Sequence, residues 1–168
     1  MAKLFLLQNG PKPTTAGPVK VTTGTSIKTM LQLLLPVGIQ GKVVEWGISF
    51  DGSAAATPIE CELVETGAVA ATVTAFVTAD ITRFGANDID PLTALMTAST
   101  SGSGYTSTSE GSVTATRELD FQQVAPTNQY VKQFPLGREP EFGNGNVLRV
   151  RVTAGAAVNA YCYVIVEI

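Results

Sequence analysis

Apolar and polar residues alternate along the stretch from Lys42 to Gly52. The apolar positions are Val44, Trp46, Ile48 and Phe50, and the positions between them are Glu45, Gly47 and Ser49. A period of two is typical of a β-strand with one buried face, and the Asp51-Gly52 pair that follows is typical of a turn. Because Trp46 is the only tryptophan and offers a large apolar surface, we expect a central strand over which other strands close.

Eight further stretches show a strand pattern. The residues from Ile27 to Leu35 also fit a helical stripe, but threonines precede them and Pro36 ends them, which favours a strand. The side chains from Val69 to Val77 are uniformly small, so they fix strand register only weakly. The eight stretches are Lys3–Gln8, Ile27–Leu35, Ile59–Glu65, Val69–Val77, Val113–Val124, Gln129–Phe134, Leu148–Thr153 and Ala157–Glu167.

The number and length of these strands predict an all-β protein. A chain of 168 residues suits one domain, and 15% charged residues with 16 glycines favour strands and turns over helices. We expect a two-sheet antiparallel sandwich of jelly-roll type with about eight strands. The predicted core comprises Val44, Trp46, Ile48, Phe50, Ile59, Cys61, Leu63, Leu119, Phe121, Leu148, Val150 and Val152.

A proline-rich segment separates the first strand from the rest of the chain. Residues 9–18 contain Pro11, Pro13 and Pro18 together with two glycines, a composition that opposes regular hydrogen bonding. We therefore divide the chain into residues 1–24, a short strand plus a Pro/Gly-rich arm, and residues 25–168, a single β-sandwich domain. The arm is either a plain connector or a segment that lies across a neighbouring subunit.

The last strand carries apolar side chains on both faces. Alternate residues from Ala160 to Ile168 form one face, while Tyr161, Tyr163 and Ile165 form the other. Such a strand is covered on both sides, and interfaces prefer aromatic residues at their centres. We expect an interface made of these three residues and the arm prolines. The alternative is that the loop from Ile81 to Leu95 folds back over this face.

The stretch from Ser99 to Ser112 is rich in serine, threonine and glycine. It has too few apolar groups to offset the entropy lost on ordering, so we expect a mobile loop. Gly102 and Gly104 do not form a dinucleotide-binding loop, because position 107 is not glycine and no helical pattern follows.

Composition excludes several classes of partner. The formal charge of −3 lacks the basic excess that nucleic-acid binding requires. No run of about 18 apolar residues could span a membrane, and Leu4–Leu7 is too short for a signal-peptide core, so we expect synthesis in the cytosol. Cys61 and Cys162 lie among alternating apolar residues and are expected to be reduced core thiols.

The residue types needed for catalysis and metal binding are sparse. The chain has no histidine, which removes the usual general base and the commonest metal ligand. Glu60 and Glu62 lie two apart on the solvent face of one strand, which favours a solubility role over glycosidase chemistry. Asp80, Asp88 and Asp90 lack the spacing of a calcium loop. We therefore predict a protein that is not an enzyme, with no cofactor and no metal.

Two segments resemble a known family. The segments Val43–Gly52 and Val147–Val164 are similar to core strands of small virion proteins of tailed bacteriophages, above all capsid decoration, or cement, proteins. This resemblance implies a structural virion protein on the outer capsid surface. It further implies a homotrimer that binds the major capsid protein, reinforces contacts between capsid subunits, and is assembled in the host cytoplasm.

Two other functions stay open at this point. The first is a carbohydrate-binding jelly-roll module of a phage fibre or tail, for which Tyr105 and Phe142 are the candidate exposed aromatic residues. The second is a hydrolase, which would need a general base that the sequence does not visibly supply.

Overall fold

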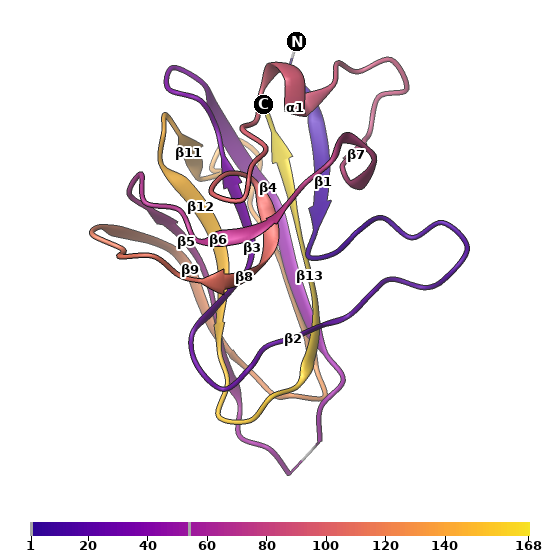
Figure 1. The fold of residues 1–168 in the computed structure, drawn as a ribbon, viewed down its shortest axis with the longest axis vertical. Coiled ribbons are helices and arrows are strands. Elements are labelled where there is room, and N and C mark those ends of the chain that lie inside the picture. The colour runs from indigo at the N-terminus through magenta and orange to yellow at the C-terminus, as the bar shows by residue number, and fades with distance from the viewer. Residues whose placement is uncertain (1, 54) are drawn as a thin grey trace.

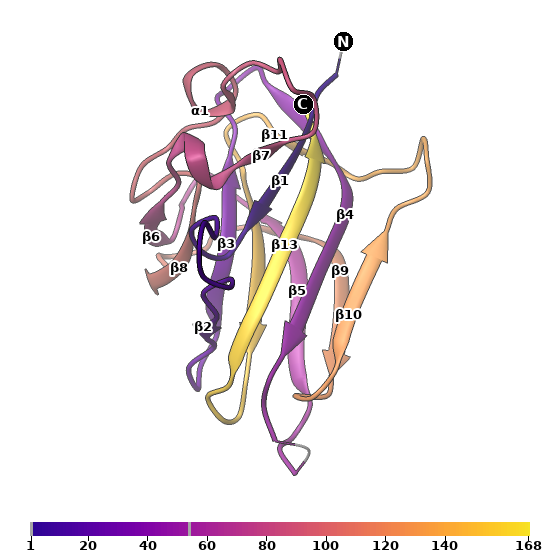
Figure 2. The ribbon, with the colours of Figure 1, turned by 90° about the vertical axis from the view of Figure 1, so that its right-hand side faces the viewer.

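The computed structural model describes residues 2–53 and 55–168 and shows two antiparallel β-sheets packed face to face (Figures 1 and 2). The seven-stranded sheet has the order β10 (Gln129–Gln133), β4 (Gln40–Phe50), β13 (Asn159–Glu167), β1 (Leu4–Gln8) and β7 (Thr82–Arg83). Two short strands extend it, β11 (Glu141–Gly143) on β4 and β2 (Val21–Thr22) on β13.

The six-stranded sheet lies opposite. Its order is β6 (Thr72–Ala75), β8 (Gly104–Ser109), β3 (Lys28–Leu34), β12 (Val147–Thr153), β5 (Ile59–Thr66) and β9 (Thr116–Val124). Two single-turn helices, η1 (Thr78–Asp80) and α1 (Pro91–Ala94), lie in the connection between β6 and β8. The predicted all-β sandwich is confirmed, and the ambiguous stretch before Pro36 is a strand.

The order of pairing identifies the sandwich as a jelly roll. Eight strands form its body, and in chain order the first pairs with the last: β1 with β13, β3 with β12, β4 with β10 and β5 with β9. This nested pairing is that of one long hairpin wound around the sandwich, the arrangement of two Greek keys. The termini consequently lie side by side, with Lys3 and Ile168 hydrogen-bonded to each other through their backbones.

Trp46 lies at the centre of the core and is fully buried. Its indole Nε1 donates to Asp120 Oδ2 at 3.1 Å, and the Tyr130 hydroxyl donates to the same oxygen at 2.9 Å. The rings of Trp46 and Tyr130 pack edge to face with centroids 5.4 Å apart. Because Asp120 belongs to β9, this contact joins the two sheets.

Two of the predicted core residues are wrong, and a register shift explains each. Ile165 pairs with Glu45 but Val166 pairs with Val43, so Val44 is left half-buried and Val43 takes its place in the core. A second shift lies between β5 and β9.

This second shift reverses the phase of β9. Leu63 pairs with Asp120 and Val64 with Glu118, so the bulge falls at Leu119, which is half-buried against the core. Phe121 then points away from the core and is 42% exposed. The other nine predicted core residues are buried.

The stretch predicted as a mobile loop, Ser99–Ser112, contains β8 and is ordered between β6 and β3. Its serines are used as polar anchors, since Ser103 Oγ donates to Leu34 O and accepts from Leu34 N. The prediction failed because these strands are held by backbone and hydroxyl hydrogen bonds rather than by apolar side chains.

The two cysteines are free and buried, as predicted. Cys61 lies on β5 and Cys162 on β13, so they belong to opposite sheets. Burial raises the pKa of the Cys61 thiol to about 12, which keeps it protonated at neutral pH.

We predict that Trp46→Ala lowers the free energy of unfolding by about 3–5 kcal/mol, since it removes a large buried ring and leaves Asp120 without one donor. The matched control is Phe121→Ala, which we expect to cost about 0.5 kcal/mol because that ring is largely in water. Urea unfolding of both variants measures the difference. Equal losses would contradict the assignment of the core.

Candidate functional site

The outer face of the seven-stranded sheet carries a group of apolar side chains from three strands, β1, β13 and β10. We call it the outer-face patch, and it comprises Leu4, Leu6, Val131, Tyr161, Tyr163 and Ile165. Ile165 lies opposite Leu6, while Tyr163 and Val131 both lie opposite Gly47, on either side of β4. All six side chains are partly accessible. The three β13 residues predicted for an interface therefore lie together, next to further apolar groups.

The loop from Ile81 to Leu95, the alternative cover for this face, takes another course. Its strand β7 pairs with β1 at the edge of the sheet, and Leu92 and Leu95 pack against the core. Phe84 follows β7 and is 54% exposed, with its backbone N–H donating to Leu4 O. The segment therefore adds an apolar side chain beside the outer-face patch.

Gly47 has no side chain, and the space above it in the middle of the patch is occupied by the Tyr163 ring. A Cβ atom at this position would lie 2.6 Å from Cε1 of Tyr163, so the tyrosine ring lies directly on the backbone of β4. The Tyr163 hydroxyl donates to Glu45 Oε1 at 2.5 Å, and the Tyr161 hydroxyl donates to Gln8 Oε1 at 3.1 Å. The two rings are thus held at their hydroxyl ends, with centroids 6.4 Å apart.

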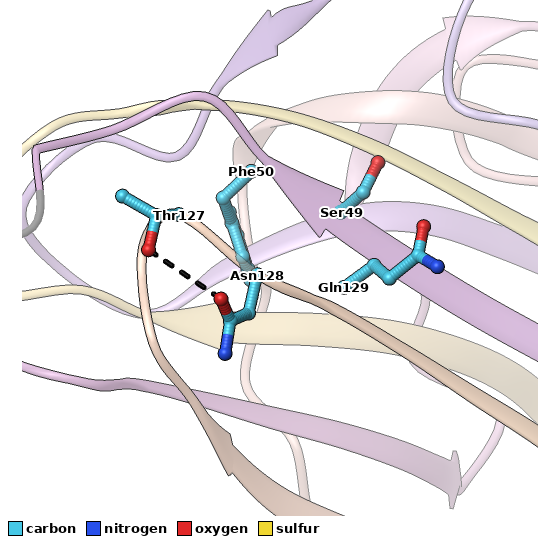
Figure 3. Close-up of a pocket in the computed structure, with 5 residues that line it drawn as sticks. All are labelled: Ser49, Phe50, Thr127, Asn128 and Gln129. Carbon is cyan, nitrogen blue, oxygen red and sulfur yellow. Dashed lines mark hydrogen bonds between the residues drawn. The ribbon is translucent and has the colours of Figure 1, made fainter.

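A groove runs over β4 between these tyrosines and β10. We call it the tyrosine groove. It has a volume of about 120 Å³ and is lined by Ile48, Ser49, Gln129, Tyr130, Val131, Tyr161 and Tyr163. At Ser49 and Gln129 it continues into a hollow of about 370 Å³ that also includes Phe50, Thr127 and Asn128 (Figure 3). Ser49 and Gln129 pair in register and project from neighbouring strands. The groove therefore combines aromatic rings with uncharged amide and hydroxyl groups.

The tyrosine hydroxyls of the site have raised pKa values. Burial is the main cause for Tyr163, and its hydrogen bond to Glu45 raises the pKa further. Burial raises the pKa of Tyr161 as well. Both groups are therefore neutral donors at physiological pH and are not candidates for a general base.

The arm is fixed at both ends and projects between them. Asn9 N donates to Cys162 O, while the Asn9 side chain accepts from Cys162 N and donates to Ala160 O. The other end returns beside Gly10, where a Cβ atom would meet Val19 O at 3.1 Å, and continues into β2. Residues 11–20, including Pro11, Pro13 and Pro18, are exposed, and the loop extends from the sandwich in Figure 1.

The arm begins directly beside the tyrosines. Gln8, the last residue of β1, accepts from the Tyr161 hydroxyl and donates through Nε2 to Pro11 O at 3.1 Å. The backbone N–H of Lys12 donates to Asp80 Oδ1, which directs the arm toward the β7 edge of the sheet. The two parts of the predicted interface are thus connected through one glutamine side chain.

Four of the five acidic residues considered for catalysis or metal binding have structural contacts, and the fifth, Glu60, is exposed. Glu62 pairs with Arg151 at 2.8 Å, and Asp88 pairs with Lys3 at 2.6 Å. Asp80 accepts from Val77 N, and Asp90 accepts from Leu92 N at the start of α1. Among the described residues, no group of three or more acidic or cysteine side chains is placed to hold a metal ion.

The two aromatic residues considered for a carbohydrate site do not form one. Phe142 is 2% exposed and packs in the core. Tyr105 is partly buried against Phe76, with ring centroids 5.4 Å apart. The prediction of exposed aromatic loops at these positions is therefore wrong, because both residues lie on short strands that close the sandwich.

Arg149 is fully buried on the outer face of the six-stranded sheet. Its guanidinium donates to Glu110 O at 3.1 Å and to Val69 O, and lies 3.5 Å from Glu110 Oε2. Glu110 in turn accepts from Thr29 N and from the Thr29 hydroxyl. This network holds the connections around Val69 and Glu110 over the sheet, a role that alternation along one strand cannot reveal.

The chain matches no protein-family model, no curated protein and no solved structure. No helix within the described residues is long and apolar enough to cross a membrane. The geometry of the outer-face patch and the arm therefore carries the functional argument.

We predict that Gly47→Ala lowers the free energy of unfolding by about 1–3 kcal/mol, because the new methyl group displaces the Tyr163 ring. In a Tyr163→Ala background the same change is expected to cost much less, since the two sites are in contact. Gly17→Ala is the control, because nothing lies within 4 Å of a Cβ atom there. Additive losses in the double variant would contradict this packing.

We also predict a loss of stability at alkaline pH. Burial and the hydrogen bond to Asp120 raise the pKa of Tyr130 from an ordinary value of 10.0 to about 12. The unfolded chain therefore loses this proton first, so the stabilisation is complete below pH 10 and is lost as the pH approaches 12. Denaturant unfolding across this range measures the decline. Tyr130→Phe should make it shallower, and an unchanged slope would contradict the assignment.

Proposed function

We propose that this protein is a structural virion protein that binds the outer surface of a phage capsid and reinforces contacts between capsid subunits. The observation that carries the proposal is the outer-face patch beside a projecting, proline-rich arm. A partly exposed apolar surface of this kind marks a protein interaction site. The resemblance of the Trp46 strand and the last two strands to decoration proteins supports the same role.

The jelly roll is compatible with this role but does not single it out. The fold occurs in viral capsid proteins and in lectins, so the site must decide between them. The part of the outer-face patch formed by Leu4, Leu6 and Ile165 is apolar, which favours a protein partner. We assign the major capsid protein as that partner and a homo-oligomer, a trimer, as the functional unit.

The chemistry of the chain supports a binding role rather than an enzymatic one. Four of the five candidate acidic side chains, all but the exposed Glu60, are engaged in ion pairs or backbone hydrogen bonds. The site tyrosines are neutral. The two buried reduced thiols suit assembly in the host cytoplasm, where disulfides are rare. The mature location under this proposal is the capsid surface of the virion.

The proposal predicts a copy number proportional to that of the major capsid protein in purified virions of the encoding phage, measured by quantitative mass spectrometry. With shells that lack the protein, Ile165→Asp should reduce co-sedimentation at least tenfold, because a buried unpaired charge costs more than about 1.4 kcal/mol. Phe121→Asp, on the opposite sheet, is the control and should bind normally. A few copies per virion, or equal binding by both variants, would contradict the proposal.

A second candidate is a carbohydrate-binding module of a phage fibre or tail. The tyrosine groove favours it, because aromatic rings flanked by uncharged amides and hydroxyls also suit a neutral sugar. Copy number separates the two candidates, since a fibre or tail component would be present in a few copies only.

A further inference from the structure

The strand β10 forms a free edge of the seven-stranded sheet, and we propose that it pairs with β10 of a second copy of the same chain. The two strands run antiparallel about a two-fold axis at Val131. Leu136 of each copy then enters the hollow beside Thr127 of the other. This contact goes beyond the capsid-binding role and does not rest on it.

Three residues of β10 have backbone groups that face away from the sheet. Phe134 N donates to Val44 O at 2.9 Å, so Phe134 and every second residue before it bond to β4. The N–H and C=O groups of the residues between them point outward, and these residues are Gln129, Val131 and Gln133. No other strand of the described part of the chain pairs along this side of β10.

The edges formed by β6, β7 and β9 are each protected. β7 has only two residues, and on β6 the Val73 N–H already donates to Thr100 O. β9 is interrupted by the bulge at Leu119 and carries three charged residues. Short edges, bulges and charges are the usual means of preventing a sheet edge from pairing with another chain. β10 instead has a regular register and one charged residue, Lys132.

The backbone of β10 is self-complementary in the register centred on Val131. An axis at this residue places Gln129 of one copy opposite Gln133 of the other and the two valines opposite each other. All three outward-facing residues are then paired, and about six inter-strand hydrogen bonds form. An axis at either neighbouring residue would pair only two of the three.

The inner face of β10 favours the same register. Lys132 lies on this face, with its ammonium nitrogen 5.9 Å from the centroid of the Phe134 ring. In the proposed pair it comes opposite Tyr130 of the second copy, whose hydroxyl donates to Asp120. The ammonium group therefore approaches a carboxylate, whereas an axis at Lys132 would place two ammonium groups opposite each other.

The connection that follows β10 carries a rigidly held apolar side chain. Leu136 is 96% exposed and lies in a tight turn in which Arg138 N donates to Pro135 O at 2.9 Å. Gly137 has a positive φ, as the third residue of a type II turn requires, so the direction of Leu136 is fixed by the backbone. The connection extends beyond the edge of the sheet at β10 (Figure 2).

The leucine and the hollow lie at opposite ends of the free edge. Leu136 is five residues after Val131, and Pro126 is five residues before it. The axis at Val131 therefore brings Leu136 of one copy to the level of Pro126 of the other, beside the hollow of about 370 Å³ that Phe50 and Thr127 line (Figure 3). The operation that pairs the strands thus also fills both hollows.

The contact is isologous, because the same surface of both copies takes part, and it joins two copies only. It cannot close the three-fold ring of the proposed trimer. Under that proposal it would join copies that belong to different trimers.

The test is disulfide formation at the two-fold axis. In Val131→Cys the two new thiols lie on residues whose Cα atoms are about 5.5 Å apart, a separation that a disulfide spans. The matched variant is Gln133→Cys, on the same strand and face, because its two thiols would be about 13 Å apart along the strand. The native thiols do not take part because both are buried. Mild oxidation of the full chain followed by non-reducing electrophoresis measures the rate.

A second pair of variants tests the inserted side chain in the Val131→Cys background. Leu136→Ser removes it, and we expect cross-linking to become at least five times slower. The control is Val37→Ser, because Val37 is 82% exposed at the same position of an equivalent turn, in which Ile39 N donates to Pro36 O. That turn precedes β4 and should not affect the rate. Both side chains are in water in the single chain, so the unfolding midpoint should not change.

Each outcome decides the proposal. Cross-linking of Val131→Cys at least five times faster than that of Gln133→Cys supports it, whereas equal rates or no cross-link overturn it. Equal rates for Leu136→Ser and Val37→Ser also overturn it. These measurements need no capsid, so a protein that cross-links at Val131→Cys but fails to bind shells would refute the decoration role alone. Shell binding without cross-linking would refute this contact alone.

Discussion

The carboxylate of Asp120 is the contact on which the sandwich depends. A tryptophan can fill the centre of a β core only if its indole N–H finds a partner, since an unsatisfied buried donor costs about 1–3 kcal/mol. Asp120 supplies that partner from the opposite sheet and also accepts from Tyr130. It lies at the side of the sandwich where β9 and β10 are edge strands, so one oxygen atom orients both edges around the Trp46 ring.

The two sheets differ in how their outer faces are treated. The six-stranded sheet covers the middle of its own, because Arg149 and Glu110 hold neighbouring connections over it and Gln32 binds Ala71 and Gly102. These buried polar groups have most of their hydrogen-bonding capacity satisfied within the chain, although Arg149 Nε has no partner among the described residues. Phe121, on the edge strand β9, stays exposed. The seven-stranded sheet instead leaves tyrosine, leucine and isoleucine side chains partly accessible. The contrast supports the proposal that a partner binds the seven-stranded sheet.

Local alternation was enough to predict the strands around Trp46, Ile59 and Leu148, because each has one face in the core. It failed where a bulge reversed the phase, as at Val44 and Phe121, since a bulge depends on the partner strand and not on the bulged strand alone. Alternation along one strand placed Tyr161, Tyr163 and Ile165 on one face. It could not show that Gln129 and Val131, which belong to another strand, lie beside them. Their position follows from the pairing of β10 with β4 across about 80 residues.

Because the neck of the arm is closed, the length of the arm can change without a change in the rest of the fold. Because Gly10 and Val19 already meet, the length of the segment between them has little influence on the rest of the fold. Doubling such a loop raises its closure cost by only about 0.6 kcal/mol. Insertions between Thr14 and Ala16 would therefore act as a spacer adjustment. Under the proposed capsid-binding role, relatives that differ only in this loop would be able to span different subunit spacings on shells of different curvature, with one unchanged β scaffold.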